Sequence, residues 1–259
     1  MCPRGGSLMG GEGGPLHPSR IVAHCLLIEA GEALVLVDTG LGTGDIADPK
    51  RLGQPFRALV RPTCTAAETA IRQVEGLGFD PRDLRHIVVT HLDLDHAGGL
   101  SDFPQAEVHV LAAELAMAEA PPLRERARYV AAQWAHGPNW VGHEAGGDRW
   151  FGFESVRVLP DLDAEIAMVP LAGHSAGSAG IAVRRPEGWL LHCGDAYFHR
   201  NEIATPHSCP PGLRLFQTVV QHDGEARHRN QERLRELARE HGDEVRLFSS
   251  HDPEELAQS

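Results

Sequence analysis

Four side chains that can bind metal ions stand close together in the segment THLDLDHAGGL, residues 90–100. His91, Asp93, Asp95 and His96 are interleaved with two leucines that can face a hydrophobic core. Alternate residues of an extended chain point the same way, and a turn after them can direct the last pair toward a second position. A lone histidine is more often structural or solvated. This cluster instead predicts a loop that binds one or two metal ions.

Three small residues, Ala97, Gly98 and Gly99, follow the cluster directly. Glycine permits close backbone approach and dihedral angles that other residues avoid. We expect the tripeptide to use both properties where the chain turns at the metal-binding loop.

The residues before this loop predict the elements that must position it. The apolar runs 21–29 and 33–40 are separated by Ala-Gly-Glu, a pattern typical of a hairpin or of adjacent strands. Apolar residues at helical spacing predict a helix over 65–76, with Thr65 as a cap. The short run HIVVT, residues 86–90, predicts a buried strand that leads straight into the loop.

The residues after the loop alternate between strand and helix patterns. We expect a strand over 108–111, then a helix that ends near Ala120, before two prolines. Residues 121–150 are predicted to form a helical insertion that covers or borders the site. Short strand patterns and a strong amphipathic helix follow at 156–160, 165–170, 180–185, 188–195 and 225–240. This alternation favours an α/β fold with layered sheets and helices.

Composition narrows the classes of partner and compartment. The 259 residues carry a formal charge of −12, so a broad basic surface for nucleic acid is not expected. The five cysteines are scattered without a disulfide framework, which favours a reducing cytoplasm. The sequence shows no apolar run of membrane-spanning length and no secretory signal, so we expect neither membrane insertion nor export.

The cluster resembles the H-x-H-x-D-H signature of the metallo-β-lactamase superfamily. Four other segments are similar to superfamily motifs in the same order: VLVDTG (35–40), LAGHSAGSAGI (171–181), LLHCGDAYF (190–198) and SSHDPEEL (249–256). The resemblance spans about 21–255. It implies a four-layered αββα sandwich, with residues 1–20 as an irregular lead-in and 21–259 as one domain.

The resemblance also implies a set of ligands for two divalent metal ions. Zinc is the expected metal, and manganese and iron are the alternatives. One ion would be bound by His91, Asp93 and His174, the other by Asp95, His96 and His251, with Asp195 between them. Asp38 would support the site from behind. Asp93 departs from the family pattern, which usually has histidine there, and adds a negative charge and a harder oxygen donor.

Such a site is expected to hydrolyse an ester or lactone of a small molecule by means of a metal-bound hydroxide. Asp95 would orient the nucleophile and transfer a proton, and Tyr197 would polarise the substrate carbonyl. The alternatives are a thioesterase similar to glyoxalase II, a phosphodiesterase, a di-iron redox protein and a non-catalytic metal-binding protein. The sequence is compatible with a homodimer.

Other residues able to bind metals are not among the ligands that the resemblance implies. Cys193 would lie on the same strand face as Asp195, but a buried structural thiol is the expectation. The histidines outside the matched motifs are expected to be structural or solvated, among them His24, His86, His109 and His143.

Overall fold

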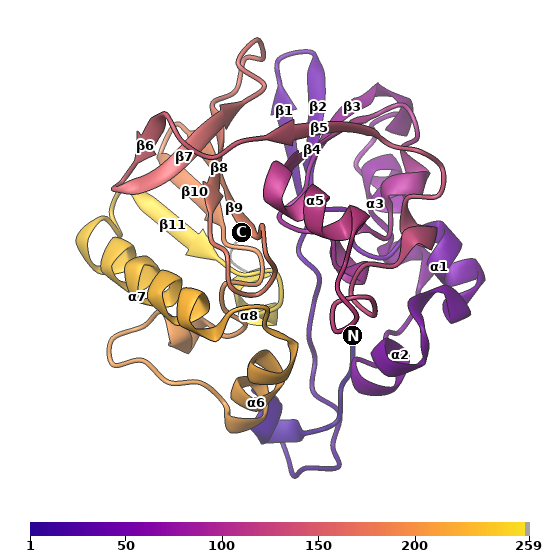
Figure 1. The fold of residues 1–259 in the computed structure, drawn as a ribbon, viewed down its shortest axis with the longest axis vertical. Coiled ribbons are helices and arrows are strands. Elements are labelled where there is room, and N and C mark those ends of the chain that lie inside the picture. Colours follow the sequence, from indigo (N-terminus) through magenta and orange to yellow (C-terminus); the bar gives the residue numbers. More distant parts are fainter. Residues whose placement is uncertain (257–259) are drawn as a thin grey trace.

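Two mixed β-sheets face each other in the computed structural model, which describes residues 1–256 (Figure 1). The first sheet has the order β1 (Leu26–Ala30), β2 (Ala33–Val37), β3 (Leu84–Val88), β4 (Glu107–Leu111) and β5 (Asn139–His143). The second has the order β11 (Val245–Phe248), β10 (Gly188–His192), β9 (Ala179–Arg185), β8 (Ile166–Pro170), β7 (Phe153–Val158) and β6 (Asp148–Trp150).

Strand direction follows from the connections. The predicted hairpin is confirmed: β1 and β2 pair antiparallel around Gly31, which has a positive φ of 66°. Strands β2, β3, β4 and β5 run parallel, with helical or irregular segments between them. The carboxyl ends of β3 and β4 therefore meet at one edge of the first sheet.

Helices cover the outer face of each sheet, which confirms the predicted αββα sandwich. Helices α3 (Ala70–Gly76) and α5 (Ala112–Glu119) pack through Val74 and Ala118 on the first sheet. Helix α7 (Gly224–Glu240) packs through Leu234 and Leu237 on the second. Between the sheets, buried aliphatic side chains of β2, β3, β8 and β9 form one core, and burial of each stabilises the fold by about 1.5–3 kcal/mol.

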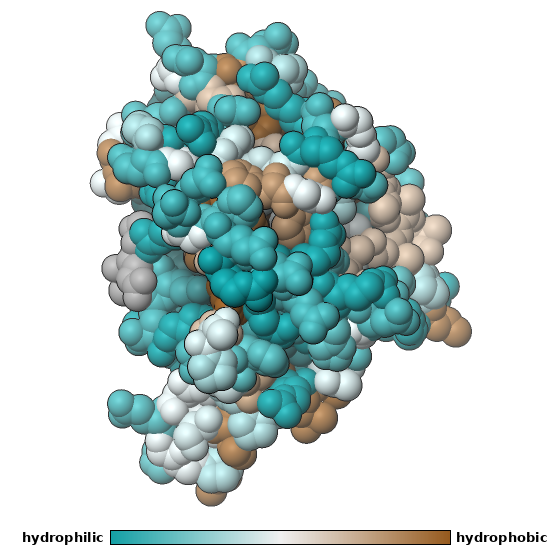
Figure 2. All heavy atoms as spheres, turned by 90° about the vertical axis from the view of Figure 1, so that its left-hand side faces the viewer, coloured by the Kyte–Doolittle hydropathy of each residue, from teal (hydrophilic) through white to brown (hydrophobic). Residues whose placement is uncertain are grey.

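Helix α7 matches the amphipathic pattern predicted for 225–240. Its first turn is capped by the Asp223 carboxylate, which accepts from the N–H groups of Glu225 and Ala226. On its outer side Arg229 and Glu225 form an ion pair at 2.7 Å. The face of the molecule seen in Figure 2 is largely hydrophilic, in keeping with a solvated outer side for this helix.

The remaining helices are short: α1 (Thr43–Ala47), α2 (Gln54–Leu59), α4 (Leu94–Ala97), α6 (Pro211–Val220) and α8 (Pro253–Leu256). Within residues 1–256, no helix is long and apolar enough to cross a membrane. The N-terminal lead-in is irregular but packed, because its 3₁₀ turn Gly6–Met9 lies against α6 and Ser19 donates to the carbonyl of Pro3.

Two predictions of local helical structure were wrong. Residues 121–150 are not helical beyond one 3₁₀ turn, Ala131–Gln133, because two prolines follow α5 and glycines and short strands occupy the rest. Thr65 makes no side-chain cap, since a 3₁₀ turn separates it from α3, which begins after Thr69.

Gly98 and Gly99 are needed for close backbone approach alone. Their φ values, −60° and −86°, suit any residue, so the expected unusual dihedrals are absent at both. A Cβ on Gly98 would lie 2.8 Å from the Gly40 carbonyl oxygen and 2.5 Å from Asp45 Oδ2. The loop after β2 is thus packed directly on the metal-binding loop.

We predict that Gly98→Ala lowers the free energy of unfolding by about 1–3 kcal/mol, because neither neighbour is free to move away from the added methyl group. Urea denaturation followed by circular dichroism measures the change. Gly76→Ala is the control, because Gly76 is an exposed position of α3 where an added Cβ would lie within 4 Å of no atom of residues 1–256. Equal destabilisation of the two variants would contradict the close packing.

Candidate metal centre

The metal-binding loop begins where β3 ends. Residues Val89–Asp93 continue without regular structure, and Asp93 then opens the single turn α4. Leu92 and Leu94 are buried, as their alternation with the ligand residues predicts. The four ligand residues of the loop are consequently directed to the opposite side.

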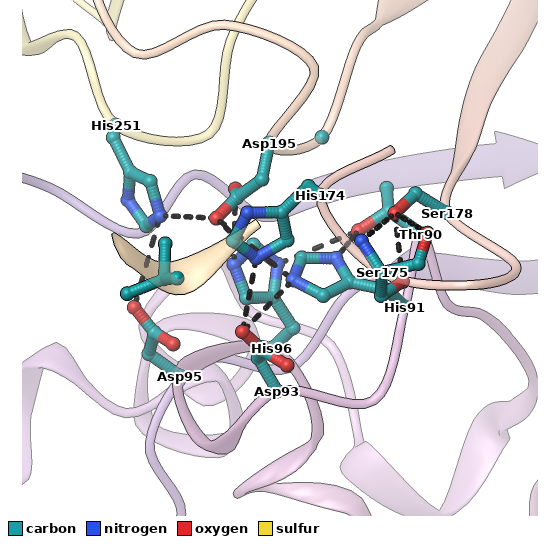
Figure 3. A network of polar contacts seen from close by, with 12 residues as sticks. Thr90, His91, Asp93, Asp95, His96, His174, Ser175, Ser178, Asp195 and His251 are labelled. Carbon is teal, nitrogen blue, oxygen red and sulfur yellow. Dashed lines mark hydrogen bonds and ion pairs between the residues drawn. The ribbon is translucent and has the colours of Figure 1, made fainter. Parts of the chain in front are cut away.

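Three further side chains reach the same place from the second sheet (Figure 3). His174 follows β8, Asp195 follows β10 and His251 follows β11, so each comes from the carboxyl end of a strand. Gly194, at φ 55°, makes the turn that directs Asp195 inward. All three are buried.

Asp195 lies between two groups of candidate ligands. Its Oδ2 is 3.4 Å from His174 Nε2 and 3.0 Å from His251 Nε2. Its Oδ1 is 3.3 Å from His96 Nε2. The carboxylate is thus placed to be shared by two positions.

The first position is surrounded by His91, Asp93 and His174. Asp93 Oδ2 lies 3.0 Å from His174 Nε2 and 3.6 Å from His91 Nε2. At the second position, His251 Nε2 lies 3.8 Å from Asp95 Oδ2, with His96 in the same group. Donor atoms about 3.3 Å apart are expected around one tetrahedral zinc ion, so both groups have a compatible spacing.

Among the residues that the structure describes, three buried atoms of this centre have no hydrogen-bond partner: His91 Nε2, His96 Nε2 and Asp195 Oδ1. An unpartnered buried polar atom costs about 1–3 kcal/mol, so several in one place require an explanation. Lone pairs converging from imidazole and carboxylate are the donor set that divalent transition metals accept. The residues therefore fit divalent metal ions.

Asp38 holds the loop from behind. It accepts from Thr90 N and Thr90 Oγ1, both at 2.7 Å, and from His96 Nδ1 at 2.8 Å. A proton fixed on Nδ1 leaves the His96 Nε2 lone pair directed at the centre. Asp38 has a positive φ of 54°, a conformation that costs free energy and that these three bonds offset.

Arg128 is a site residue that sequence reasoning missed. Its Nη1 donates to Asp93 Oδ1 at 3.1 Å, which leaves Oδ2 facing His174. The arginine is also held by the Val220 carbonyl and, at 3.3 Å, by Glu125 Oε2. Burial opposes ionisation of Asp93, but Arg128 and then His91 bring its pKa well below the usual range.

Glu114 of α5 is a second unpredicted residue, and it ties two ligand segments together. One oxygen accepts from Leu92 N at 3.0 Å and from Tyr129 Oη at 3.1 Å. The other accepts from Ser175 Oγ at 2.7 Å and Gly177 N at 2.9 Å. Leu92 adjoins His91 and Ser175 adjoins His174, so the glutamate is a positioning residue. An acid within an apolar helix pattern gave only a faint signal of this role.

Tyr197 does not lie where a carbonyl-polarising residue would be useful. Its side chain is 0% exposed, and its hydroxyl donates to Glu255 Oε1 at 3.0 Å. Glu255 also accepts from Ser249 N, so the tyrosine braces the segment that carries His251. Phe198 is nearer the centre, with its ring centroid 4.7 Å from that of His251.

Cys193 is buried in the core beside α7, which agrees with a structural thiol.

A pocket opens next to His251. Part of its apolar lining comes from the N-terminal lead-in, and it is lined by Met9, Ile21, Phe198 and Leu213 together with Arg20 and Arg200.

Comparison with known proteins identifies the family of the chain. Residues 19–230 match the model of the metallo-beta-lactamase superfamily. The chain belongs to this superfamily. A protein of Mycobacterium tuberculosis named "Probable metallo-hydrolase" is 44% identical over 235 residues, which cover 90% of this chain and 76% of that protein. Within the superfamily, this chain is a metallo-hydrolase.

Lactonases of the metallo-β-lactamase superfamily are also similar to the chain. An N-acyl homoserine lactonase of Azorhizobium caulinodans is 27% identical over 224 residues, 85% of this chain and 77% of that protein. A solved N-acyl homoserine lactone hydrolase, with its product N-hexanoyl-L-homoserine at the catalytic metal centre, aligns with a TM-score of 0.73. That alignment covers 100% of this chain and 92% of the other at 21% identity, and it shows the shared fold.

We predict that Glu114→Gln loosens both ligand segments, because an amide NH₂ would face two N–H or O–H donors that need an acceptor. The free energy of unfolding should fall by about 1–3 kcal/mol, and metal should be lost faster to a chelator. The control is Glu119→Gln, an exposed change on the same helix. Identical chelator kinetics in the two variants would rule out the positioning role.

A second prediction concerns the pair of Asp93 and Arg128. Asp93→His restores the residue usual in the superfamily but removes a carboxylate partner from a buried guanidinium. We expect a loss of about 2–4 kcal/mol in the free energy of unfolding. Adding Arg128→Met should recover most of it, giving a clear coupling energy in a double-mutant cycle. Additive effects of the two changes would contradict the pairing.

Proposed function

We propose that the chain binds two divalent metal ions, with zinc as the preferred metal, and that it hydrolyses a carboxylic ester of a small molecule. Lactones are the preferred class of ester. The observation that carries the proposal is the position of Asp195 between two groups of ligands whose unpartnered atoms converge. The similarity to lactonases over most of the chain supports the choice of substrate class.

Two metal ions, when bound, would supply Lewis acidity and lower the pKa of a water molecule toward neutrality. The protein's own residues would hold the donor geometry and transfer the proton. Asp195 and the histidines hold the donor geometry, and Asp38 and Glu114 keep it from relaxing. Pre-set geometry of this kind reduces the reorganisation needed to reach the transition state.

Asp95 is the residue we assign to proton transfer. Its carboxylate lies at the second position, and its side chain is 10% exposed. In the reaction, water oxygen bonds to the carbonyl carbon and the bond from that carbon to the ring oxygen breaks. Asp95 would carry the released proton to the ring oxygen, so a lactone and water give a hydroxy acid.

The pocket beside His251 supports a substrate with an apolar part. Its wall of Met9, Ile21, Phe198 and Leu213 would exclude water from an acyl or alkyl chain. Arg200 at its rim is already paired with Asp252 at 2.8 Å, so it does not present an unpaired charge. Arg20, the other arginine of the lining, forms no ion pair within residues 1–256, so the choice of a lactone over a phosphodiester depends on the similarity to lactonases and not on this lining.

The test is a substrate panel measured on zinc-loaded protein: N-acyl homoserine lactones of several chain lengths, a simple γ-lactone, an aryl ester, an acyl-glutathione thioester and an aryl phosphodiester. We expect the kcat/KM for a lactone to exceed that for each other class at least tenfold. Preference for the thioester or the phosphodiester would replace the lactonase assignment with that alternative.

Asp95→Asn supplies the mechanistic arm of this test. It should lower kcat on the best lactone by a factor of about 10² or more, as expected for loss of a general acid–base group. Its metal content, measured in parallel, separates lost chemistry from lost metal. Full metal content with unchanged kcat would refute the role of Asp95, and no turnover of any class by the metal-loaded wild type would favour a non-catalytic protein.

A further inference from the structure

A second set of metal-binding side chains lies on the first sheet and shares no residue with the centre around Asp195. It consists of His86 on β3, Glu107 and His109 on β4, and His143 on β5. The sequence predicts that these histidines are structural or solvated, because they lie far apart in the chain and match no superfamily motif. The sheet brings them together.

Strand register explains the assembly. Across the parallel pair of β3 and β4, His86 is the partner of Glu107 and Val88 is the partner of His109. Side chains two residues apart share a face of a strand, so these groups stand on one side of the sheet. Across β4 and β5, His143 is the partner of Leu111, two residues beyond His109. The three histidines thus form a row across three strands.

Two histidines of this row, His86 and His109, and the neighbouring Glu107 bring three donor atoms together. His86 Nδ1 lies 3.3 Å from His109 Nε2 and 3.5 Å from Glu107 Oε2, and His109 Nε2 lies 3.9 Å from the same oxygen. Zinc–ligand bonds of about 2.0–2.1 Å at tetrahedral angles put donor atoms about 3.3 Å apart. We propose that His86, Glu107 and His109 bind a divalent transition metal ion, with a fourth position left for water.

His143 supports this arrangement from behind. Its Nε2 lies 3.0 Å from His109 Nδ1, and the two rings are stacked with centroids 5.3 Å apart. A proton on His109 Nδ1, donated to His143, leaves the lone pair of His109 on Nε2, the atom that faces His86 and Glu107. Metal-binding histidines commonly have such a partner on the other ring nitrogen.

The protonation state of the row also suits metal binding. Burial, followed by the neighbouring His143 and His86, lowers the pKa of His109 to about 4, and burial lowers the pKa of His86 and His143. A lowered pKa favours the neutral imidazole, the form that donates a lone pair. The Glu107 side chain is 45% exposed, which gives an ion a route from solvent.

The alternative is a row of hydrogen-bonded imidazoles that binds no ion. Both forms account for the contact between His86 and His109, so the deciding observation is the number of ions bound. The experiment compares the number of ions bound by each variant with the number bound by the wild type. Its result is then independent of how many ions the centre around Asp195 binds and of whether the protein hydrolyses lactones.

The experiment equilibrates the full chain with Zn²⁺, removes free ion by gel filtration and measures zinc per chain by elemental analysis. His86→Asn and Glu107→Gln are each expected to bind one ion fewer than the wild type. Glu107→Gln alters a half-exposed side chain, so it guards against a folding defect in the first variant. His17→Asn, which removes an exposed histidine elsewhere, should bind as many ions as the wild type.

His143→Asn separates a supporting role from a ligand role. It should keep the wild-type number of ions at saturating Zn²⁺ while weakening the affinity of one of them about 10–100-fold in competition with a chelator. Wild-type zinc content in both His86→Asn and Glu107→Gln would overturn the proposal and leave a hydrogen-bonded row.

Discussion

The energetics of the candidate metal centre are dominated by the free-energy cost of burying several carboxylates close together. Asp38, Asp93, Asp95 and Asp195 all lie in this part of the molecule with exposures that leave little water around them. Buried carboxylates that face one another are unfavourable unless cations or hydrogen-bond donors compensate them. Arg128 supplies one fixed positive charge, at Asp93. Two divalent ions, bound as we propose, would balance negative charge that Arg128 does not compensate.

The sandwich serves this requirement by bringing loops from two sheets to a common edge. The loop after β3 provides four of the candidate ligand residues, and the segments after β8, β10 and β11 provide one each. Interactions behind the ligands then limit their freedom: Asp38 fixes His96, Glu114 joins the segments of His91 and His174, and Glu255 with Tyr197 braces the segment of His251. Residues that never touch substrate therefore decide how well the donors converge.

Asp93 illustrates how one departure from a family pattern is accommodated. A carboxylate replaces an imidazole at the first position, and one of its oxygens is taken up by Arg128 while the other faces His174. The charge of the ligand is thus partly compensated before any ion is present. The arginine comes from the segment 121–150, which borders the site as expected although it is not helical.

Local patterns predicted the hairpin, the strand that leads to the metal-binding loop and the amphipathic helix α7, because each depends on residues close in sequence. They could not predict Arg128 or Glu114, whose partners are distant along the chain. The role expected for Tyr197 rested on its position after Asp195, and the structure instead directs its hydroxyl to Glu255. The row of His86, His109 and His143 is likewise visible only once strand register is known.

Anomalous X-ray scattering at the zinc edge, from crystals of zinc-loaded protein, tests the central claim most directly. The account predicts two peaks flanking Asp195, one in contact with His91, Asp93 and His174 and the other with Asp95, His96 and His251. A single peak at this centre, with Asp93 bound only to Arg128, would contradict the two-metal hydrolase.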